Sequence, residues 1–149
     1  MIYSCDLRKG FVYMSVFAKT EAGFYRAIEP VIIVSVSQTT ELHRAISETI
    51  ARGNPTIPTP HYGEISATIP IILKHAGVKT WNAFERGSRC WMIREKDGTY
   101  QIVGQREGEY GGWVDDPEQT TMFPSGTSVD LVIDRLIEIL QAAAKERSR

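Results

Sequence analysis

Two short apolar runs, at residues 11–17 and 31–36, are the first regular pattern in the chain. Both are rich in β-branched and aromatic side chains, and both are too short for a stable helix. Continuous apolar runs of this length are typical of strands that are covered on both faces. We therefore predict two well-buried strands that lie in one sheet.

The spacing of apolar residues changes to that of a helix between residues 41 and 52. Thr40 stands where an N-cap residue is expected, and Gly53 stands where a C′ residue is expected. The pattern predicts a helix over residues 41–52. Three prolines within residues 54–60 then fix φ and remove backbone donors, which predicts an extended connection across the surface.

The segment 70–76 is a short apolar run that ends at Gly77, and it fits either a helix or a strand. A lysine and a histidine near its end favour a helix, because basic side chains interact well with the C-terminal end of the helix dipole. Thr80 is a candidate N-cap for a further short helix that carries one Trp and one Phe and stops at Gly87.

Alternating apolar and polar residues at 90–105 surround an Asp-Gly dipeptide at 97–98, which favours a two-residue hairpin turn. Pairing Lys96 with Thr99 across this turn places Ile93 opposite Ile102. A slip by one residue would turn the apolar face outward, so the pattern also predicts the register. The expected buried face consists of Trp91, Ile93, Tyr100 and Ile102.

A second, longer helix pattern occupies the end of the chain, where Thr127 and Asp130 have the spacing of a capping box with Asp in place of Glu or Gln. Burying four or five of its apolar side chains, at about 1.5–3 kcal/mol each, is large against a net stability of about 5–15 kcal/mol. We therefore expect this helix to belong to the core. Its apolar stripe consists of Val129, Val132, Ile133, Leu136, Ile137 and Leu140.

These elements fit one domain over residues 1–149. A chain of 149 residues with 42% hydrophobic content is long enough to bury roughly two thirds of its unfolded surface around one core. Strands followed by a helix, a hairpin and a terminal helix predict an α+β fold. We expect a single, mainly antiparallel sheet with packed helices, including a long C-terminal helix.

Composition and charge exclude several classes of protein. No apolar run approaches the roughly 20 residues that span a bilayer, and the first residues lack the pattern of a secretory signal, so we expect a cytoplasmic protein without membrane contact. The balance of 17 basic and 18 acidic residues, with no Lys/Arg block, argues against direct nucleic-acid binding.

Acidic and aromatic residues are concentrated at 107–118, a tract with five carboxylates and no basic residue. The whole chain has a formal charge of −1, so the residues outside the tract carry +4. Carboxylates attract a cationic partner, and Tyr and Trp supply rigid contact area. We predict a Gly-rich surface connection that contacts a partner, with a solvated loop around one buried Trp as the alternative. The candidate contact residues are Glu107, Glu109, Tyr110, Trp113, Asp115, Asp116 and Glu118.

Residues suited to catalysis are few and scattered. His61 is the best candidate, because it follows the rigid proline segment beside Tyr62 and because loops often carry active groups. His43 falls on the helix 41–52 and is expected at its surface. Cys5 and Cys90 have no Cys-x-x-Cys or zinc-type spacing, so two buried thiols are expected. Without a phosphate loop, nucleophile motif or metal motif, we predict no catalytic residue, no metal and no cofactor.

The second half of the chain resembles the C-terminal half of bacterial contact-dependent growth inhibition immunity proteins, and the extended segment 54–60 is compatible with them. The likeness covers about half of the chain. It is carried by the residues Thr80-Trp81-Asn82-Ala83-Phe84-Glu85, Trp91-Met92-Ile93, Asp97-Gly98-Thr99-Tyr100-Gln101-Ile102, Trp113, Phe123-Pro124 and the helix pattern at 128–140.

The resemblance implies a small cytoplasmic α+β protein that is an inhibitor and not an enzyme. Such a protein binds the toxic C-terminal domain of a cognate effector, commonly a nuclease, and blocks its activity. Because the site of a nuclease attracts phosphate, it tends to be cationic, and the acidic tract could occupy it as a substrate mimic. Two alternatives stay open: a small hydrolase that uses His61 with a carboxylate or Cys, and a regulatory binding module without a toxin partner.

Overall fold

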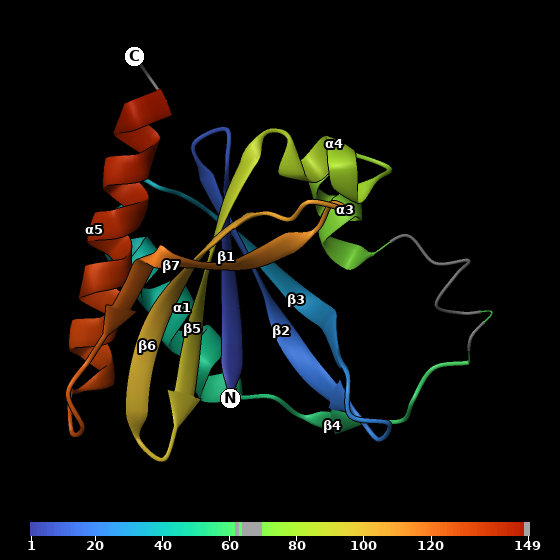
Figure 1. Ribbon diagram of the computed structural model, residues 1–149, viewed down its shortest axis with the longest axis horizontal. Coiled ribbons are helices and arrows are strands. Elements are labelled where there is room, and N and C mark those ends of the chain that lie inside the picture. Colours follow the sequence, from blue (N-terminus) through green and yellow to red (C-terminus); the bar gives the residue numbers. More distant parts are fainter. Residues whose placement is uncertain (62, 64–69, 148–149) are drawn as a thin grey trace.

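The structure is a computed structural model that describes residues 1–61, 63 and 70–147 (Figure 1). Within these residues the chain forms a sheet of seven strands and four helices. The strands are β1 (Ile2–Arg8), β2 (Phe11–Thr20), β3 (Tyr25–Ser35), β4 (Thr56–Ile57), β5 (Ser88–Lys96), β6 (Thr99–Glu107) and β7 (Trp113–Met122). The helices are α1 (Thr39–Arg52), α3 (Ile71–Ala76), α4 (Trp81–Glu85) and α5 (Val129–Arg147).

The sheet has the strand order β3-β2-β1-β5-β6-β7, and every neighbouring pair in that order is antiparallel. β4 is a two-residue addition that runs parallel to β2. β3 and β7 therefore form the two edges, and β1 lies between β2 and β5 in the middle. The α+β class and the mainly antiparallel sheet predicted from the sequence are confirmed.

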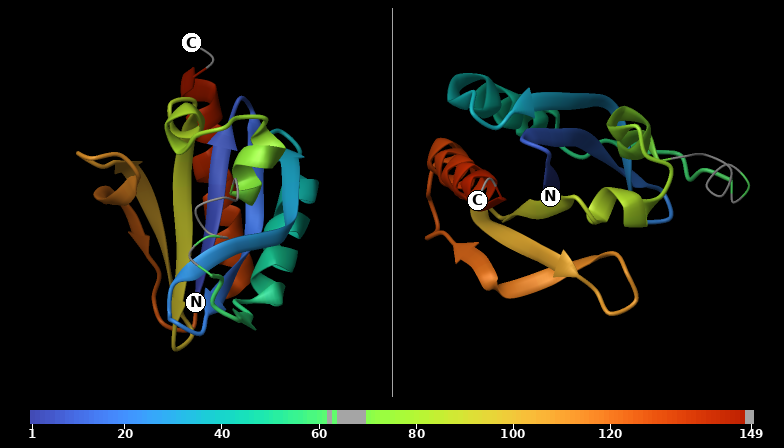
Figure 2. Two further views of the ribbon diagram at one scale, coloured as in Figure 1. Left: turned by 90° about the vertical axis from the view of Figure 1, so that its right-hand side faces the viewer. Right: turned by 90° about the horizontal axis from the view of Figure 1, so that it is seen from above.

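The two long helices, α1 and α5, pack against each other and lie side by side (Figure 2). α1 also contacts β2 and β3, whereas α5 contacts β6. The apolar stripe predicted for the terminal helix is confirmed, because Val132, Ile133, Leu136, Ile137 and Leu140 are all buried. The sheet contributes the other half of this main core through Tyr3, Cys5, Leu7, Val12, Met14, Trp91, Ile93 and Ile102.

The short helices α3 and α4 cover the opposite face of the sheet. Tyr13 alternates with the core residues Val12 and Met14 along β2, so its side chain points away from the main core. There its ring contacts Phe84 of α4 edge-on, with 6.1 Å between the ring centroids. Phe84 forms a small second core with Ile72 and Leu73 of α3.

The predicted hairpin is confirmed in both turn and register. Lys96 pairs with Thr99 and Ile93 pairs with Ile102. Both residues of the turn at 97–98 have positive φ, +52° and +76°, as a type I′ turn requires. Of the four residues predicted on its apolar face, Trp91, Ile93 and Ile102 are buried and Tyr100 is half-buried against the main core.

Several local predictions are corrected by the structure. β1 was not predicted, although it lies in the middle of the sheet. Residues 31–35 of the run at 31–36 are the end of β3, an edge strand that is mostly half-buried, since β2 is the one strand that pairs with it among the described residues; Val36 follows the strand and is buried.

The predicted caps are corrected at both long helices. α1 starts after Gln38 without a side-chain cap, so Thr40 is not its N-cap. At α5, Ser128 Oγ accepts a hydrogen bond from the Leu131 amide at 3.4 Å, whereas Thr127 donates to the Pro124 carbonyl and does not form a capping box.

Other local predictions are confirmed. Residues 71–76 are helical, which decides between the helix and the strand that the sequence left open, and Gly77 follows in the left-handed conformation. Thr80 caps α4, since its Oγ accepts a hydrogen bond from the Ala83 amide at 3.1 Å. Gly53 follows α1 with φ of +66°.

Candidate functional site

The acidic tract begins at the end of β6, passes through a turn at 108–112 and continues into β7. The turn is closed by a hydrogen bond from the Gly108 amide to the Gly112 carbonyl at 2.8 Å. Gly111 and Gly112 have φ of +87° and +76°, values that side chains other than glycine rarely adopt. The expected surface connection is therefore correct for 108–112 and wrong for the part from Trp113 onward, which is an edge strand.

Tyr110 stands at the tip of this turn, and 96% of its surface is exposed. Glu107 and Glu109 beside it are also exposed. The turn lies close to α4, because a Cβ added at Gly111 would be 3.8 Å from Oδ1 of Asn82. The tip therefore presents one aromatic ring and two carboxylates next to a short helix.

Asp115 is exposed on the edge strand β7, but other side chains hold its carboxylate in place. Its carboxylate accepts hydrogen bonds from both terminal nitrogens of Arg94 and one from Gln105 at 2.9 Å. The hydrogen bonds from Arg94 and Gln105 lower the pKa of Asp115 to about 2. Its negative charge is thus compensated by Arg94, a residue far from the tract in the sequence.

Asp116 stabilises an irregular part of β7. Its carboxylate accepts hydrogen bonds from the Gln119 side chain at 2.8 Å and from the Glu118 amide at 3.0 Å, and both lower its pKa. The pairing of β6 with β7 shifts here, between Val103 and Gln105. A Cβ at Gly104 would lie 2.5 Å from Cβ of Gln119, so a glycine is needed where this irregular segment crosses β6.

Trp113 is half-buried at the start of β7, and its Nε1 is a buried donor without a hydrogen-bond partner in the described part of the chain. It packs at the base of the turn and is less accessible than Tyr110. Among the described residues, the exposed carboxylates of Glu107, Glu109 and Glu118 form no ion pair. The tract therefore divides into three open carboxylates and two, Asp115 and Asp116, that serve the fold.

The predicted hydrolase residues do not converge. His61 is exposed, whereas Cys5 and Cys90 are both buried free thiols. Burial raises the pKa of both thiols, which keeps them protonated and poorly nucleophilic. Asp6 pairs with Cys90 across the strands, so Cys5 and Cys90 point to opposite faces of the sheet. Tyr62, the neighbour of His61, lies outside the described residues.

The other histidines join elements of the fold. His43 on α1 lies with Nε2 at 3.6 Å from Asp130 and 3.5 Å from Asp134, both on α5. His75 on α3 contacts Glu29 on β3 at 3.0 Å. No group of three or more His, Cys, Asp or Glu side chains in the described ranges is arranged to hold a metal ion. None of the described helices is both long enough and apolar enough to cross a bilayer.

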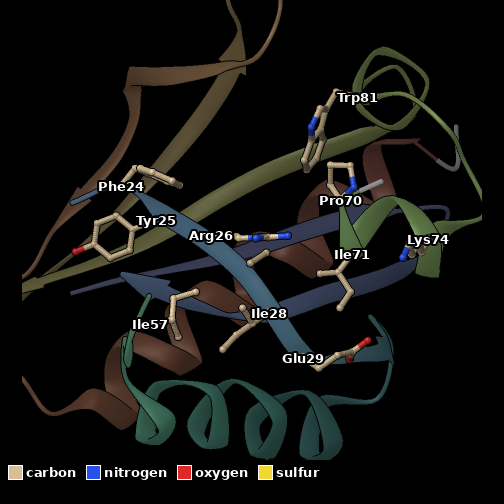
Figure 3. Close-up of a pocket in the computed structure, with 11 residues that line it drawn as sticks. Phe24, Tyr25, Arg26, Ile28, Glu29, Ile57, Pro70, Ile71, Lys74 and Trp81 are labelled. Carbon is tan, nitrogen blue, oxygen red and sulfur yellow. The ribbon is translucent and has the colours of Figure 1, made fainter. Parts of the chain in front are cut away.

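A cleft at the β3 edge was not predicted from the sequence (Figure 3). It has a volume of about 580 Å³. Its walls come from three separate parts of the sequence: the start of β3, β4, and the segment that carries α3 and Trp81 of α4. Three of its residues, Phe24, Tyr25 and Trp81, are aromatic and exposed. The sequence shows the aromatic residues, but only the tertiary structure shows that they are exposed and line one cleft.

The sequence matches no protein-family model and no curated protein. Two solved structures share the fold over nearly the whole chain. One is a protein of unknown function, NMB0488, from Neisseria meningitidis, with a TM-score of 0.65 and 13% identity over 95% of this chain and 93% of that chain. The other is a chain of the CdiA-CT/CdiI toxin and immunity complex from Yersinia pseudotuberculosis, with a TM-score of 0.60 and 11% identity over 93% and 95%. At these identities the likeness establishes the fold.

Proposed function

We propose that this chain is a cytoplasmic immunity protein that binds the toxic C-terminal domain of a cognate contact-dependent growth inhibition effector and neutralises it. The observation that carries the proposal is the fold shared with a chain of a toxin and immunity complex along almost the full length of both chains. The resemblance at residues 80–140 supports the same conclusion independently of the comparison.

The exposed part of the acidic tract is the proposed contact with the toxin. It consists of the turn with Glu107, Glu109 and Tyr110, called the acidic tip, together with Glu118 on β7. Glu107, Glu109 and Glu118 give an open field of negative charge, and Tyr110 offers a ring that is almost wholly accessible. We propose that the toxin is a nuclease, because a nuclease site must attract phosphate and is therefore complementary to such a field. Aromatic side chains of this kind commonly supply the anchors of protein interfaces.

Under this proposal, the chain inhibits the toxin by binding to its site, and no catalytic reaction by the chain is needed. A stable interface buries about 800 Å² on each partner, which is more than one turn can supply. Neighbouring exposed groups must contribute, and α4 is close to the turn through Asn82. The hydrolase alternative is weakened by the two buried thiols and by the exposed position of His61, which has no contact with either thiol.

The experiment is a rescue assay with the toxic C-terminal domain of the cognate effector. Cells that express that C-terminal domain should survive when this chain is co-expressed, and the two purified proteins should form a stable complex. A variant of the effector domain that is inactive but folded provides the control for binding. Continued killing together with no complex between the purified proteins would overturn the proposal. A complex with a different cellular protein and none with the domain would favour the regulatory module.

A further inference from the structure

The cleft at the β3 edge has an aliphatic interior and an aromatic rim. Ile28, Ile57 and Ile71 are half-buried in it, and Trp81, at 44% exposure, stands at its mouth. Figure 3 shows Arg26 extending from β3 toward the side of the cleft formed by Pro70 and Ile71. The cleft thus combines apolar surface with a guanidinium group.

The charge inside the cleft is not balanced. Glu29, the acidic residue of the lining, is already engaged by His75 at 3.0 Å and by the Val31 amide at 2.9 Å. Arg26 is half-buried and forms no ion pair with any described residue, and Lys74 is likewise without an acidic partner in the described ranges. A half-buried guanidinium without a carboxylate has lost part of its hydration without compensation, so it favours an incoming anion.

We propose that this cleft receives a segment of the protein partner that inserts an apolar side chain between Ile28, Ile71 and Trp81 and places a carboxylate on Arg26. The planar fork of Arg26 suits a carboxylate, and the aliphatic floor suits the neighbouring side chain. The inference rests on the proposed function only for the identity of the partner, the toxin domain.

The cleft and the acidic tip adjoin the same helix, which argues for a protein segment over a free small anion. Trp81 lines the cleft, and the next residue, Asn82, reaches the turn that carries Tyr110. A partner that spans α4 would contact the positive charge of Arg26 in the cleft on one side and the negative charges of Glu107 and Glu109 on the other. Two contacts of opposite sign fix the orientation of the partner as well as its affinity.

A direct test uses a small probe and does not need the toxin. The probe is N-acetyl-Phe-Asp-amide at up to about 10 mM, which detects dissociation constants near 1 mM, followed by amide and indole NMR shifts of the full chain. We expect saturable shifts at Trp81, Ile28 and Ile71. Replacing the probe's Asp by Asn, or its Phe by Ala, should weaken binding severalfold.

The matched protein variants are Arg26→Gln and Arg52→Gln, the second being an exposed arginine at the end of α1. Arg26→Gln should remove the preference for the Asp probe over the Asn probe, and Arg52→Gln should keep it. An unchanged fold is checked from the NMR spectrum. Equal shifts with both probes, no shifts at the cleft, or shifts with inorganic phosphate alone would overturn the proposal.

The second test uses the toxin domain and separates the two proposals. Arg26→Gln should raise the Kd of the complex by about tenfold or more, mainly through faster dissociation. If the toxin domain does not bind the wild-type chain but the Asp probe does, the proposed function fails and the cleft site stands. If the domain binds wild type and Arg26→Gln equally well, the cleft site fails and the proposed function stands.

Discussion

Arg94 on β5 donates two hydrogen bonds to Asp115 on β7, from Nη1 to Oδ2 at 2.6 Å and from Nη2 to Oδ1 at 2.8 Å. The pair reaches across β6, which lies between these two strands in the sheet. The ion pair stabilises the edge strand β7 near its irregular segment. It also compensates one of the five negative charges of the tract with the positive charge of Arg94.

Asp115→Asn should lower the free energy of unfolding by about 0.5–1 kcal/mol at neutral pH, because a two-point contact is lost but both partners are partly screened by solvent. The lowered pKa of Asp115, about 2 against an ordinary 3.8, gives the sign of the pH dependence. The contribution is present above pH 4 and is lost as the pH falls through about 2. Denaturation at pH 7 and at pH 2 measures the difference. Glu118→Gln is the control, and an equal loss in both variants would contradict the role of the pair.

The three exposed carboxylates of the acidic tract should increase the rate at which the toxin domain associates. We expect the combined change of Glu107, Glu109 and Glu118 to glutamine to slow association and to reduce its salt dependence, because open carboxylates attract a cationic partner over a distance. Asp115 and Asp116 are left intact so that the fold of β7 is unaffected. Stopped-flow or surface-binding kinetics at low and physiological salt measure both quantities. An unchanged rate and salt slope would exclude these three residues.

Tyr110→Ala should instead speed dissociation of the complex, since an anchoring ring acts on the bound state. The free energy of unfolding should change by less than about 0.5 kcal/mol, because the ring is almost fully exposed. The change in dissociation rate is measured alongside Trp113→Phe, which keeps an aromatic ring at the base of the turn. An unchanged dissociation rate for Tyr110→Ala would exclude the ring as an anchor.

Asp6 should make the protein less stable as the pH rises. Burial raises its pKa to about 7, an effect that its hydrogen bond with Cys90 only partly opposes. The folded state therefore keeps a proton that the unfolded chain loses near pH 4. The free energy of unfolding should fall by up to about 1.4 kcal/mol per pH unit between about pH 4 and pH 7.

Asp6→Asn removes this dependence, so its stability relative to wild type should improve between pH 5 and pH 8. Urea denaturation at both values provides the measurement. Asp97→Asn in the exposed hairpin turn is the control, since asparagine suits the same turn. A wild-type protein whose stability is equal at pH 5 and pH 8 would contradict the prediction.

Leu136→Ala should cost about 2–5 kcal/mol, because Leu136 is fully buried in the main core and its truncation leaves a cavity there. Leu131→Ala on the same helix is the matched control. Leu131 is 59% exposed, so its truncation should cost less than about 0.5 kcal/mol. Reversible denaturation of the two variants compares them directly. A cost for Leu136→Ala no larger than for the control would show that this helix is not part of the core.

The elements that the sequence predicted well are those in which one local pattern agrees with the tertiary structure. In the β5–β6 hairpin, the Asp-Gly turn and the alternation of Ile93 and Ile102 require the same register. In α5, the helical spacing of apolar residues coincides with one buried stripe. Neither element needs information from a distant part of the chain.

The sequence did not predict β1 and β7 as strands, because contacts with residues distant in the sequence stabilise them. β1 buries Asp6 and Arg8 on its second face, where polar residues normally indicate exposure, and Arg8 is satisfied there by the Phe84 carbonyl at 2.9 Å. β7 carries acidic residues and a proline, a composition typical of a loop, and β6 is the one strand that pairs with it within 1–61, 63 and 70–147. The compensation of Asp115 by Arg94 and the assembly of the cleft around Arg26 depend on tertiary contacts for the same reason.

None of the seven tract residues belongs to either of the apolar clusters found among the described residues. Substitutions of the exposed residues Glu107, Glu109 and Tyr110 should therefore have little effect on folding, provided that Gly104 keeps β7 close to β6 and that Gly111 and Gly112 keep the positive φ of the turn. Such a hairpin can diversify in sequence while the helices and central strands stay constant. Given the proposed contact with the toxin, a few changes at the tip are enough to alter which partner this fold recognises, without a loss of stability.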